Sequence, residues 1–307
     1  MRSLLVILLF LLASCSSRDH YKNLGVANKF QIPAVPFVPQ DTYQCGPASL
    51  AMVLNFRGTE VTAEELATQA FTPGKEGSLQ TDMITAVRRR GLLPFLIKDL
   101  KSLLSEVSSN NPVIILQNLG LSWYPRWHYA VVIGYDLAKE EMTLHSGHTA
   151  YSVMKLFTFE NTWSKSKNWG LVIMEPGELP ATVSEIEALS AITQLEELGL
   201  LLEAKISYQA TLRRWPSSFG ALLGLGNTEY ALHDNKAACE ILKKATELFP
   251  RSGVAWHNYA WALVANKKVR EAKAAAREAL AVVEDLLPQH KKNLGEILLG
   301  PEEKAED

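Results

Sequence analysis

The stretch that decides the fold is Gln40-Asp-Thr-Tyr-Gln-Cys45-Gly-Pro-Ala-Ser-Leu-Ala-Met-Val-Leu54. It joins a proline-rich segment, which favours an extended path, to an apolar run that predicts a helix over residues 46–57. Gly46 and Pro47 suit such a junction, because proline is tolerated in the first helical turn. Cys45 therefore stands at a helix N-terminus, whose partial positive charge favours a thiolate, and we expect it to be a nucleophile.

A second informative stretch is Trp127-His128-Tyr129-Ala-Val-Val-Ile-Gly134-Tyr135-Asp136, which predicts a strand over residues 127–135. A histidine at the start of a strand can project its ring into a cleft. The cysteine precedes the histidine by roughly 80 residues, a separation that permits pairing across two subdomains. His128 would take the thiol proton and return it to the leaving amine. Gln40, with the backbone N–H of Cys45, would bind the oxyanion.

These residues resemble a known family. Gln40, the segment that begins at Cys45 and the segment that begins at His128 resemble the papain-superfamily peptidases that process bacteriocins. Those are the double-glycine leader peptidases, numbered thirty-nine among cysteine-peptidase families. The resemblance implies a papain-like α+β fold over residues 32–175, with Cys45 as nucleophile, His128 as base and Gln40 in the oxyanion hole. It implies no metal and no organic cofactor.

The sequence departs from this family in two places. The upstream glutamine usually lies six residues before the cysteine, but Gln40 lies five before it, which leaves Gln44 as an alternative oxyanion donor. The family also orients its histidine with an aspartate at the end of the returning strand, and no carboxylate occupies that position here. A missing orienting group can cost several orders of magnitude in rate. The residues open for this role are Ser146, His145, Asp136 and Asn161.

Other reactive side chains have simpler interpretations. His145 and His148 lack a third ligand at a suitable spacing, so we expect surface positions in a hairpin for both and not a metal site. Cys239 falls in a predicted repeat helix, where core packing is the expected role. Two interpretations, a substrate groove and core or lid packing, fit the aromatic residues near His128, which are Trp123, Tyr124 and Trp127.

The N-terminus has the pattern of an export signal. One arginine precedes an apolar run from Leu4 to Ala13, which is too short to span a membrane. It ends in Leu12-Ala-Ser-Cys15, which resembles the bacterial lipobox and implies lipidation of Cys15. We therefore expect residues 1–14 to be a signal peptide and residues 15–31 a tether. The expected location is the bacterial cell envelope, lipid-anchored and facing the periplasm, at the outer membrane. A plain secretory signal is the alternative.

The C-terminal part has a repeat. Residues 176–184 read as a linker, and beyond them Ala204, Ala238 and Ala272 recur at a spacing of 34 residues. A period of 34 is the signature of tetratricopeptide helix pairs. We therefore expect an all-α repeat domain over residues 185–300 that binds a protein substrate or partner.

Composition limits the function further. The chain has 307 residues, 47% of them hydrophobic, and can bury the cores of two domains. The formal charge of −2 argues against a nucleic-acid partner, and three cysteines are too few for a disulfide scaffold. The sequence thus predicts a membrane-anchored cysteine peptidase that hydrolyses a protein or peptide recruited by its repeats. The alternative is a lipoprotein that binds peptides, or serves as a scaffold, with a degenerate peptidase fold.

Overall fold

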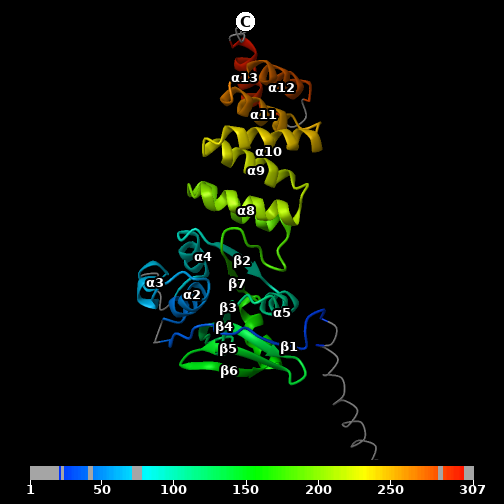
Figure 1. Cartoon of the computed structure of the whole chain (residues 1–307). Coiled ribbons are helices and arrows are strands. Elements are labelled where there is room, and N and C mark those ends of the chain that lie inside the picture. The colour runs from blue at the N-terminus through cyan, green and yellow to red at the C-terminus, as the bar shows by residue number, and fades with distance from the viewer. Residues whose placement is uncertain (1–20, 22–23, 41–43, 71–77, 283–285, 301–307) are drawn as a thin grey trace, which may run out of the picture. The chain divides into compact units, whose positions relative to one another are not determined.

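The computed structural model describes residue 21 and residues 24–40, 44–70, 78–282 and 286–300 (Figure 1). The predicted signal peptide and Cys15 lie outside these residues. The chain separates into two compact units, one containing most residues up to Ile173 and the other most residues from Val183 onward. Within the described part, no helix is both long and apolar enough to cross a membrane.

The first unit is built on one sheet, which holds seven strands in the described part of the chain. The strand order is β2-β7-β3-β4-β5-β6, and β1 pairs with β4. The pairs β3–β4, β3–β7, β4–β5 and β5–β6 are antiparallel. The strands are β1 (Lys29–Gln31), β2 (Leu93–Ile97), β3 (Val113–Asn118), β4 (Trp127–Asp136), β5 (Glu141–Ser146), β6 (Thr149–Lys155) and β7 (Gly170–Met174).

The helices of this unit include α2, which begins near its predicted start, and one that was not expected. They are α2 (Cys45–Phe56), α3 (Ala63–Ala70), α4 (Gln80–Arg88), α5 (Leu100–Ser108) and α6 (Leu156–Trp163), followed by the short 3-10 helix η3 (Ser164–Ser166). Helix α3 begins with a capping box, in which the Glu65 N–H donates to Thr62 Oγ1 over 3.2 Å and the Thr62 N–H donates to the Glu65 carboxylate over 2.9 Å. Helix α5 was not expected. The Asp99 side chain caps it by accepting from the Ser102 N–H over 2.8 Å.

Strand β4 is the central element of the site. Its residues from Tyr129 to Tyr135 are all buried, as expected of an apolar strand covered on both faces. Helices α2 and α5 pack against it (Figure 1). Helix α6 packs against β3, β5 and β6. Only the first two residues, Trp127 and His128, and the last, Asp136, are partly exposed. The start of β4 therefore emerges from the core with His128 accessible.

One segment differs from its expected role. Residues Lys29–Gln31 lie in the predicted tether, yet they form β1, in which Phe30 pairs with Tyr135 of β4. The adjacent Ile32 donates its N–H to the Ile133 carbonyl over 2.8 Å and is 1% exposed. The backbone groups of β4 that β3 leaves unpaired attract this segment, since buried backbone polar groups require partners.

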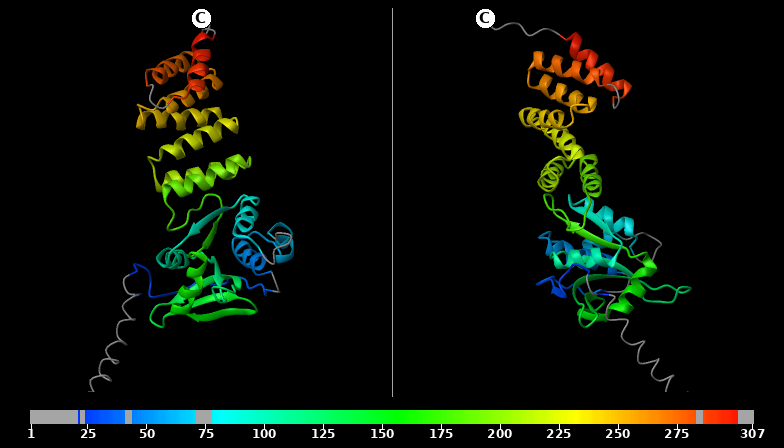
Figure 2. Two further views of the ribbon diagram at one scale, coloured as in Figure 1. Left: turned by 180° about the vertical axis from the view of Figure 1, so that it is seen from behind. Right: turned by 90° about the vertical axis from the view of Figure 1, so that its right-hand side faces the viewer.

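The second unit consists of antiparallel helix pairs (Figure 2). The first helices of the pairs begin at Glu185, Phe219 and Gly253, each 34 residues after the last, and the predicted period is confirmed. The pairs are α7 (Glu185–Glu197) with α8 (Leu201–Arg214), α9 (Phe219–Ala231) with α10 (Asn235–Leu248), and α11 (Gly253–Ala265) with α12 (Val269–Ala281).

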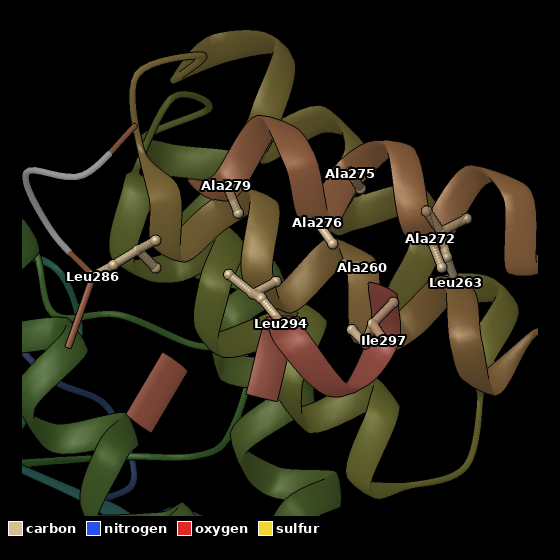
Figure 3. Close-up of a cluster of buried hydrophobic side chains, with 9 residues drawn as sticks. All are labelled: Ala260, Leu263, Ala272, Ala275, Ala276, Ala279, Leu286, Leu294 and Ile297. Atoms are coloured by element: carbon tan, nitrogen blue, oxygen red, sulfur yellow. The ribbon is translucent and has the colours of Figure 1, made fainter. Parts of the chain in front are cut away.

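Small residues allow these helices to pack closely. Ala204, Ala238 and Ala272, the positions that showed the period, are all 0% exposed. A Cβ on Gly226 of α9 would lie 2.5 Å from Leu242 Cγ of α10, so a larger residue has no room there. Helix α13 (Pro288–Leu299) covers the last pair, where its buried side chains meet a cluster of alanines from α11 and α12 (Figure 3). An apolar end that would otherwise face water is thereby closed.

Candidate active site

Cys45 is the first residue of α2, as predicted. The helix begins when the Ala48 N–H donates to the Gln44 carbonyl over 2.9 Å, and all residues from Gly46 to Leu54 are buried. Gly46 is required by the packing, because a Cβ there would lie 2.6 Å from Ser78 Oγ. The thiol is therefore held at the end of a rigid helix.

The cysteine opens into a cavity of about 490 Å³. One wall is the face of β3 and β4 that carries Leu116, Trp127 and Tyr129. The Tyr129 hydroxyl donates to the Ser78 carbonyl over 3.2 Å, which joins this wall to the segment before α4. The described lining is Cys45, Ser78, Leu79, Gln80, Leu116, Trp127, Tyr129, Lys165, Ser166 and Lys167. Trp127 thus lines a cavity, which agrees with its interpretation as part of a substrate groove. Trp123 and Tyr124, in contrast, are 81% and 68% exposed in the β3–β4 loop.

The thiol of Cys45 experiences two opposing influences. Burial raises its pKa, whereas hydrogen bonds from the backbone N–H groups of Tyr129, Gly46 and Cys45 lower it. Burial dominates, so the pKa of the free thiol lies above its ordinary value, contrary to the shift expected from the helix terminus alone. A thiolate at this position therefore needs an additional charge or a proton acceptor.

His128 is the second residue of β4, directly before Tyr129. The backbone N–H of Tyr129, which lowers the pKa of the Cys45 thiol, belongs to the residue directly after His128, so the start of β4 lies near the thiol. His128 itself is not among the described residues that line the cavity of Cys45. Among the described residues no hydrogen bond joins Cys45 to the His128 ring. The ring must approach the sulfur to take its proton, and catalytic hydrogen bonds often tighten only when substrate is bound.

The ring of His128 is held by Ser146. Its Nε2 lies 2.9 Å from Ser146 Oγ, at the end of β5. With the proton on Nε2 and donated to Ser146, Nδ1 keeps its lone pair and is the base. Burial and the charge of Arg126 both lower the pKa of His128, so the imidazole is neutral near pH 7 and able to accept a proton.

The other residues considered for this orienting role lie elsewhere. His145 Nε2 contacts the Val35 carbonyl at 3.1 Å and its Nδ1 accepts from the Tyr151 N–H over 3.2 Å. The expectation that His145 is a surface residue was wrong, because it is 0% exposed and packs between Phe37 and Tyr151. Asp136 ends β4, eight residues after His128, and pairs with Lys29 at 3.6 Å. Asn161 lies exposed on α6.

Gln40 bridges two parts of the site. Its backbone N–H donates to the Gly147 carbonyl over 3.1 Å, and its Oε1 accepts from the Gly147 N–H over 3.0 Å. Its Nε2 donates to Ser49 Oγ of α2 over 3.3 Å. The side chain, 5% exposed, thus ties the helix of Cys45 to the turn after Ser146. Nε2 has a second hydrogen, and the Gln44 side chain makes no capping hydrogen bond at the helix N-terminus.

Sequence reasoning missed the lysines of the cavity. Lys165 of η3 and Lys167 just after it line the same space as Cys45. The only signal was the stretch Trp163-Ser-Lys-Ser-Lys-Asn-Trp169, with two lysines between two tryptophans. Nothing in that pattern shows which face of the fold the lysines occupy. Cys239, by contrast, lies in α10 as predicted, partly buried and contacting the repeat core.

Solved structures resemble each part of the chain. A C39-like peptidase from Bacillus anthracis is 18% identical over 48% of this chain and 98% of its own, with a TM-score of 0.41. The peptidase domain of Streptococcus ComA is 21% identical over 46% of this chain and 98% of its own, with a TM-score of 0.38. A thermophilic TPR protein of Thermus thermophilus is 21% identical over 39% of this chain and 66% of its own, with a TM-score of 0.36.

The family comparison agrees with the fold. No curated protein matches the chain. Residues 32–170 match the Peptidase_C39 like family, and this segment contains Cys45, His128, Gln40 and Ser146. The antiparallel sheet with its helices and the 34-residue helix pairs agree with the expected fold class, α+β papain-like followed by all-α repeats. Residues 32–170 therefore match the Peptidase_C39 like family, and the helix pairs that follow resemble tetratricopeptide repeats in their 34-residue period.

Proposed function

We propose that this chain is a thiol peptidase in which Cys45 and His128 form the catalytic pair. The observation that carries the proposal is the position of the Cys45 sulfur. It opens into a cavity at the N-terminus of a buried helix, and the cavity is also lined by Tyr129, the residue next to His128. The family match of residues 32–170 supports peptide chemistry at this site.

The reaction is an acyl transfer through the sulfur. The Cys45 thiol gives its proton to Nδ1 of His128, and the sulfur attacks the peptide carbonyl carbon. The C–N bond of the tetrahedral intermediate breaks, and the amine leaves with the proton from the imidazolium. Water, deprotonated by the same imidazole, then attacks the thioester and releases the acid and the thiol. The free thiol has a raised pKa, so the imidazolium is the charge that stabilises the thiolate.

Ser146 and a glutamine complete the site in this proposal. Ser146 holds Nε2 of His128, which keeps Nδ1 available as the base. The Cys45 N–H and the second Nε2 hydrogen of Gln40 stabilise the oxyanion, with Gln44 as the alternative donor. Gln40 has a second role as a positioning residue, because it joins α2 to the turn that follows Ser146.

A thiol probe tests the catalytic pair. Iodoacetamide should alkylate Cys45 of the full chain much faster than Cys239, and His128→Ala should remove that advantage. His148→Ala is the matched control, because His148 is an exposed histidine of the β5–β6 turn. Peptide profiling of lysates treated with wild type and with Cys45→Ala then shows whether bonds are cut. Equal, slow alkylation of both cysteines, together with identical profiles, contradicts the proposal.

A non-catalytic peptide-binding protein is the second candidate. It is favoured by the serine that stands where a carboxylate would orient the histidine, since serine does not neutralise an imidazolium. If this candidate is correct, peptides protect Cys45 from alkylation but remain intact after prolonged incubation. Product analysis separates the two candidates, and it also separates hydrolysis from transfer to an amine.

We further propose that Cys15 carries the lipid anchor and that the helix pairs recruit the protein substrate. The lipobox-like Leu12-Ala-Ser-Cys15 motivates the first statement, and repeat domains of this type commonly bind proteins on their concave face. Cys15→Ser should abolish incorporation of labelled palmitate and release the protein from membranes. Cross-linking to the full-length Cys45→Ala variant should capture substrates through residues of the repeats.

A further inference from the structure

The cavity beside Cys45 carries a local positive charge on a chain whose formal charge is −2. The charged residues among its described lining are Lys165 and Lys167, and none of the described lining residues is acidic. Neither lysine forms an ion pair with any residue in the described part of the chain. Arg126, whose charge lowers the pKa of His128, adds a third cation near the site.

The backbone around the lysines is built to hold its conformation. Lys167 and Asn168 have φ angles of +58° and +54°, a left-handed conformation that costs energy in residues other than glycine. The Ser166 hydroxyl donates to the Trp163 carbonyl over 2.8 Å, and the Trp163 indole donates to the Trp169 carbonyl over 2.8 Å. Trp163 is 1% exposed. The buried tryptophan and its hydrogen bonds therefore fix the turn that brings both lysines to the cavity.

The lysines retain donors for a ligand. Lys165 Nζ donates one hydrogen to the Gly120 carbonyl over 2.9 Å, so two hydrogens of its ammonium group stay available. The remaining walls of the cavity are largely apolar and come from Leu79, Leu116 and Trp127. Both lysines are exposed, so the attraction they exert on a ligand is screened by salt. An ammonium group against apolar walls selects a group with a negative charge and an aliphatic stem.

We propose that this cavity binds a carboxylate of the peptide substrate, close to the bond that Cys45 attacks. The inference rests on the proposed function and adds a substrate class to it: peptides with an acidic residue near the cleaved bond, or with a free C-terminal carboxylate there. Lys165 and Lys167 are the specificity-determining residues. A neutral amide in the same place would leave both ammonium groups without a counter-charge.

A pair of small alkylating agents tests the charge without requiring catalysis. Iodoacetate carries a carboxylate and iodoacetamide does not, although both transfer a two-carbon group to sulfur and release iodide. The rate ratio of iodoacetate to iodoacetamide is measured at Cys45 of the full chain, with Cys239 as the internal reference. The double variant Lys165→Gln/Lys167→Gln should lower the ratio about threefold to tenfold, and added salt should reduce the difference. Lys139→Gln, an exposed lysine of the β4–β5 turn, is the matched control and should leave the ratio unchanged.

Quenched fluorescent peptides identify the source of the carboxylate. A library of ten-residue peptides, randomised at the central positions, is made with free and with amidated C-termini. If a side chain is recognised, Asp or Glu is enriched at one position in both forms. If a terminal carboxylate is recognised, only the free form is cut. Either preference should disappear in the double glutamine variant and reverse toward Lys or Arg in Lys165→Glu/Lys167→Glu.

The outcomes separate this inference from the proposed function. Cleavage that depends on Cys45 but ignores acidic groups, with an alkylation ratio unaffected by the lysine variants, overturns the inference and leaves the peptidase intact. Absence of any Cys45-dependent cleavage overturns the proposed function, and the alkylation ratio alone then decides whether the cavity prefers a carboxylate.

Discussion

Replacing Ser146 tests how the base is held. Ser146→Ala removes the 2.9 Å hydrogen bond to Nε2 of His128 and leaves the rest of β5 unchanged. A hydrogen bond between neutral groups is worth about 0.5–1.5 kcal/mol. Because 1.4 kcal/mol corresponds to a factor of ten, alkylation of Cys45 at pH 7 should slow by about twofold to tenfold. This loss is far smaller than the loss of an orienting carboxylate produces in serine peptidases.

The reverse change should increase reactivity. Ser146→Asp places a carboxylate next to the imidazole, which raises the pKa of His128 and favours the imidazolium–thiolate pair. An increase of one pKa unit is worth about 1.4 kcal/mol, or roughly tenfold in the population of that pair at pH 7. Ser152→Ala is the control, because Ser152 pairs with Leu144 on the neighbouring strand.

The assay is the rate of iodoacetamide alkylation of Cys45, followed by mass spectrometry between pH 5 and 9, with Cys239 in the same chain as reference. If Ser146→Ala leaves the rate at Cys45 unchanged, or if Ser146→Asp slows it, the proposed orientation of His128 is refuted. A parallel fall at Cys239 would instead indicate a general loss of structure.

Three further predictions concern stability. Gly46→Ala should lower the unfolding free energy by about 1–3 kcal/mol, because the Cβ of the alanine would lie 2.6 Å from Ser78 Oγ. An unchanged temperature of thermal unfolding would contradict this prediction. Glu106→Gln should lower the unfolding free energy, measured in urea, by about 3 kcal/mol. Both oxygens of the Glu106 carboxylate accept hydrogen bonds, including one of 2.7 Å from the Thr182 N–H. A loss below about 0.5 kcal/mol would show that these hydrogen bonds do not stabilise the fold. Burial lowers the pKa of His145, so its contribution to stability is complete above about pH 6.5 and is lost as the pH falls through the folded-state pKa. Urea midpoints at pH 7.5 and 5.5 test this. His145→Asn should flatten the dependence of the midpoint on pH.

Local sequence patterns predicted the elements that carry the chemistry. The Gly46-Pro47 junction placed Cys45 at the start of α2, and the apolar run after His128 marked β4. The 34-residue period predicted the helix pairs, because each pair repeats the same close contact between small residues. These predictions depend on neighbours along the chain or on a regular repeat. They succeed for that reason.

Other features depend on contacts between distant residues. His145 was expected on the surface, but Val35 and Phe37, more than a hundred positions earlier, cover it. Helix α5 had a readable cap in Asp99, yet it is only nine residues long and its apolar face is short. The choice of Ser146 to hold His128 follows from the register of β5 against β4, which no local pattern shows.

The bridge made by Gln40 has a consequence for the motions of the protein. The side-chain amide of Gln40 hydrogen-bonds both the first turns of α2 and the β5–β6 turn, so a movement of one disrupts the hydrogen bond that holds the other. Fluctuations that open this corner should therefore widen the access to sulfur and imidazole in a single cooperative event. The rate at which the Cys45 thiol exchanges with a bulky disulfide reagent would then report the free energy of this opening, and hence the local stability of the site.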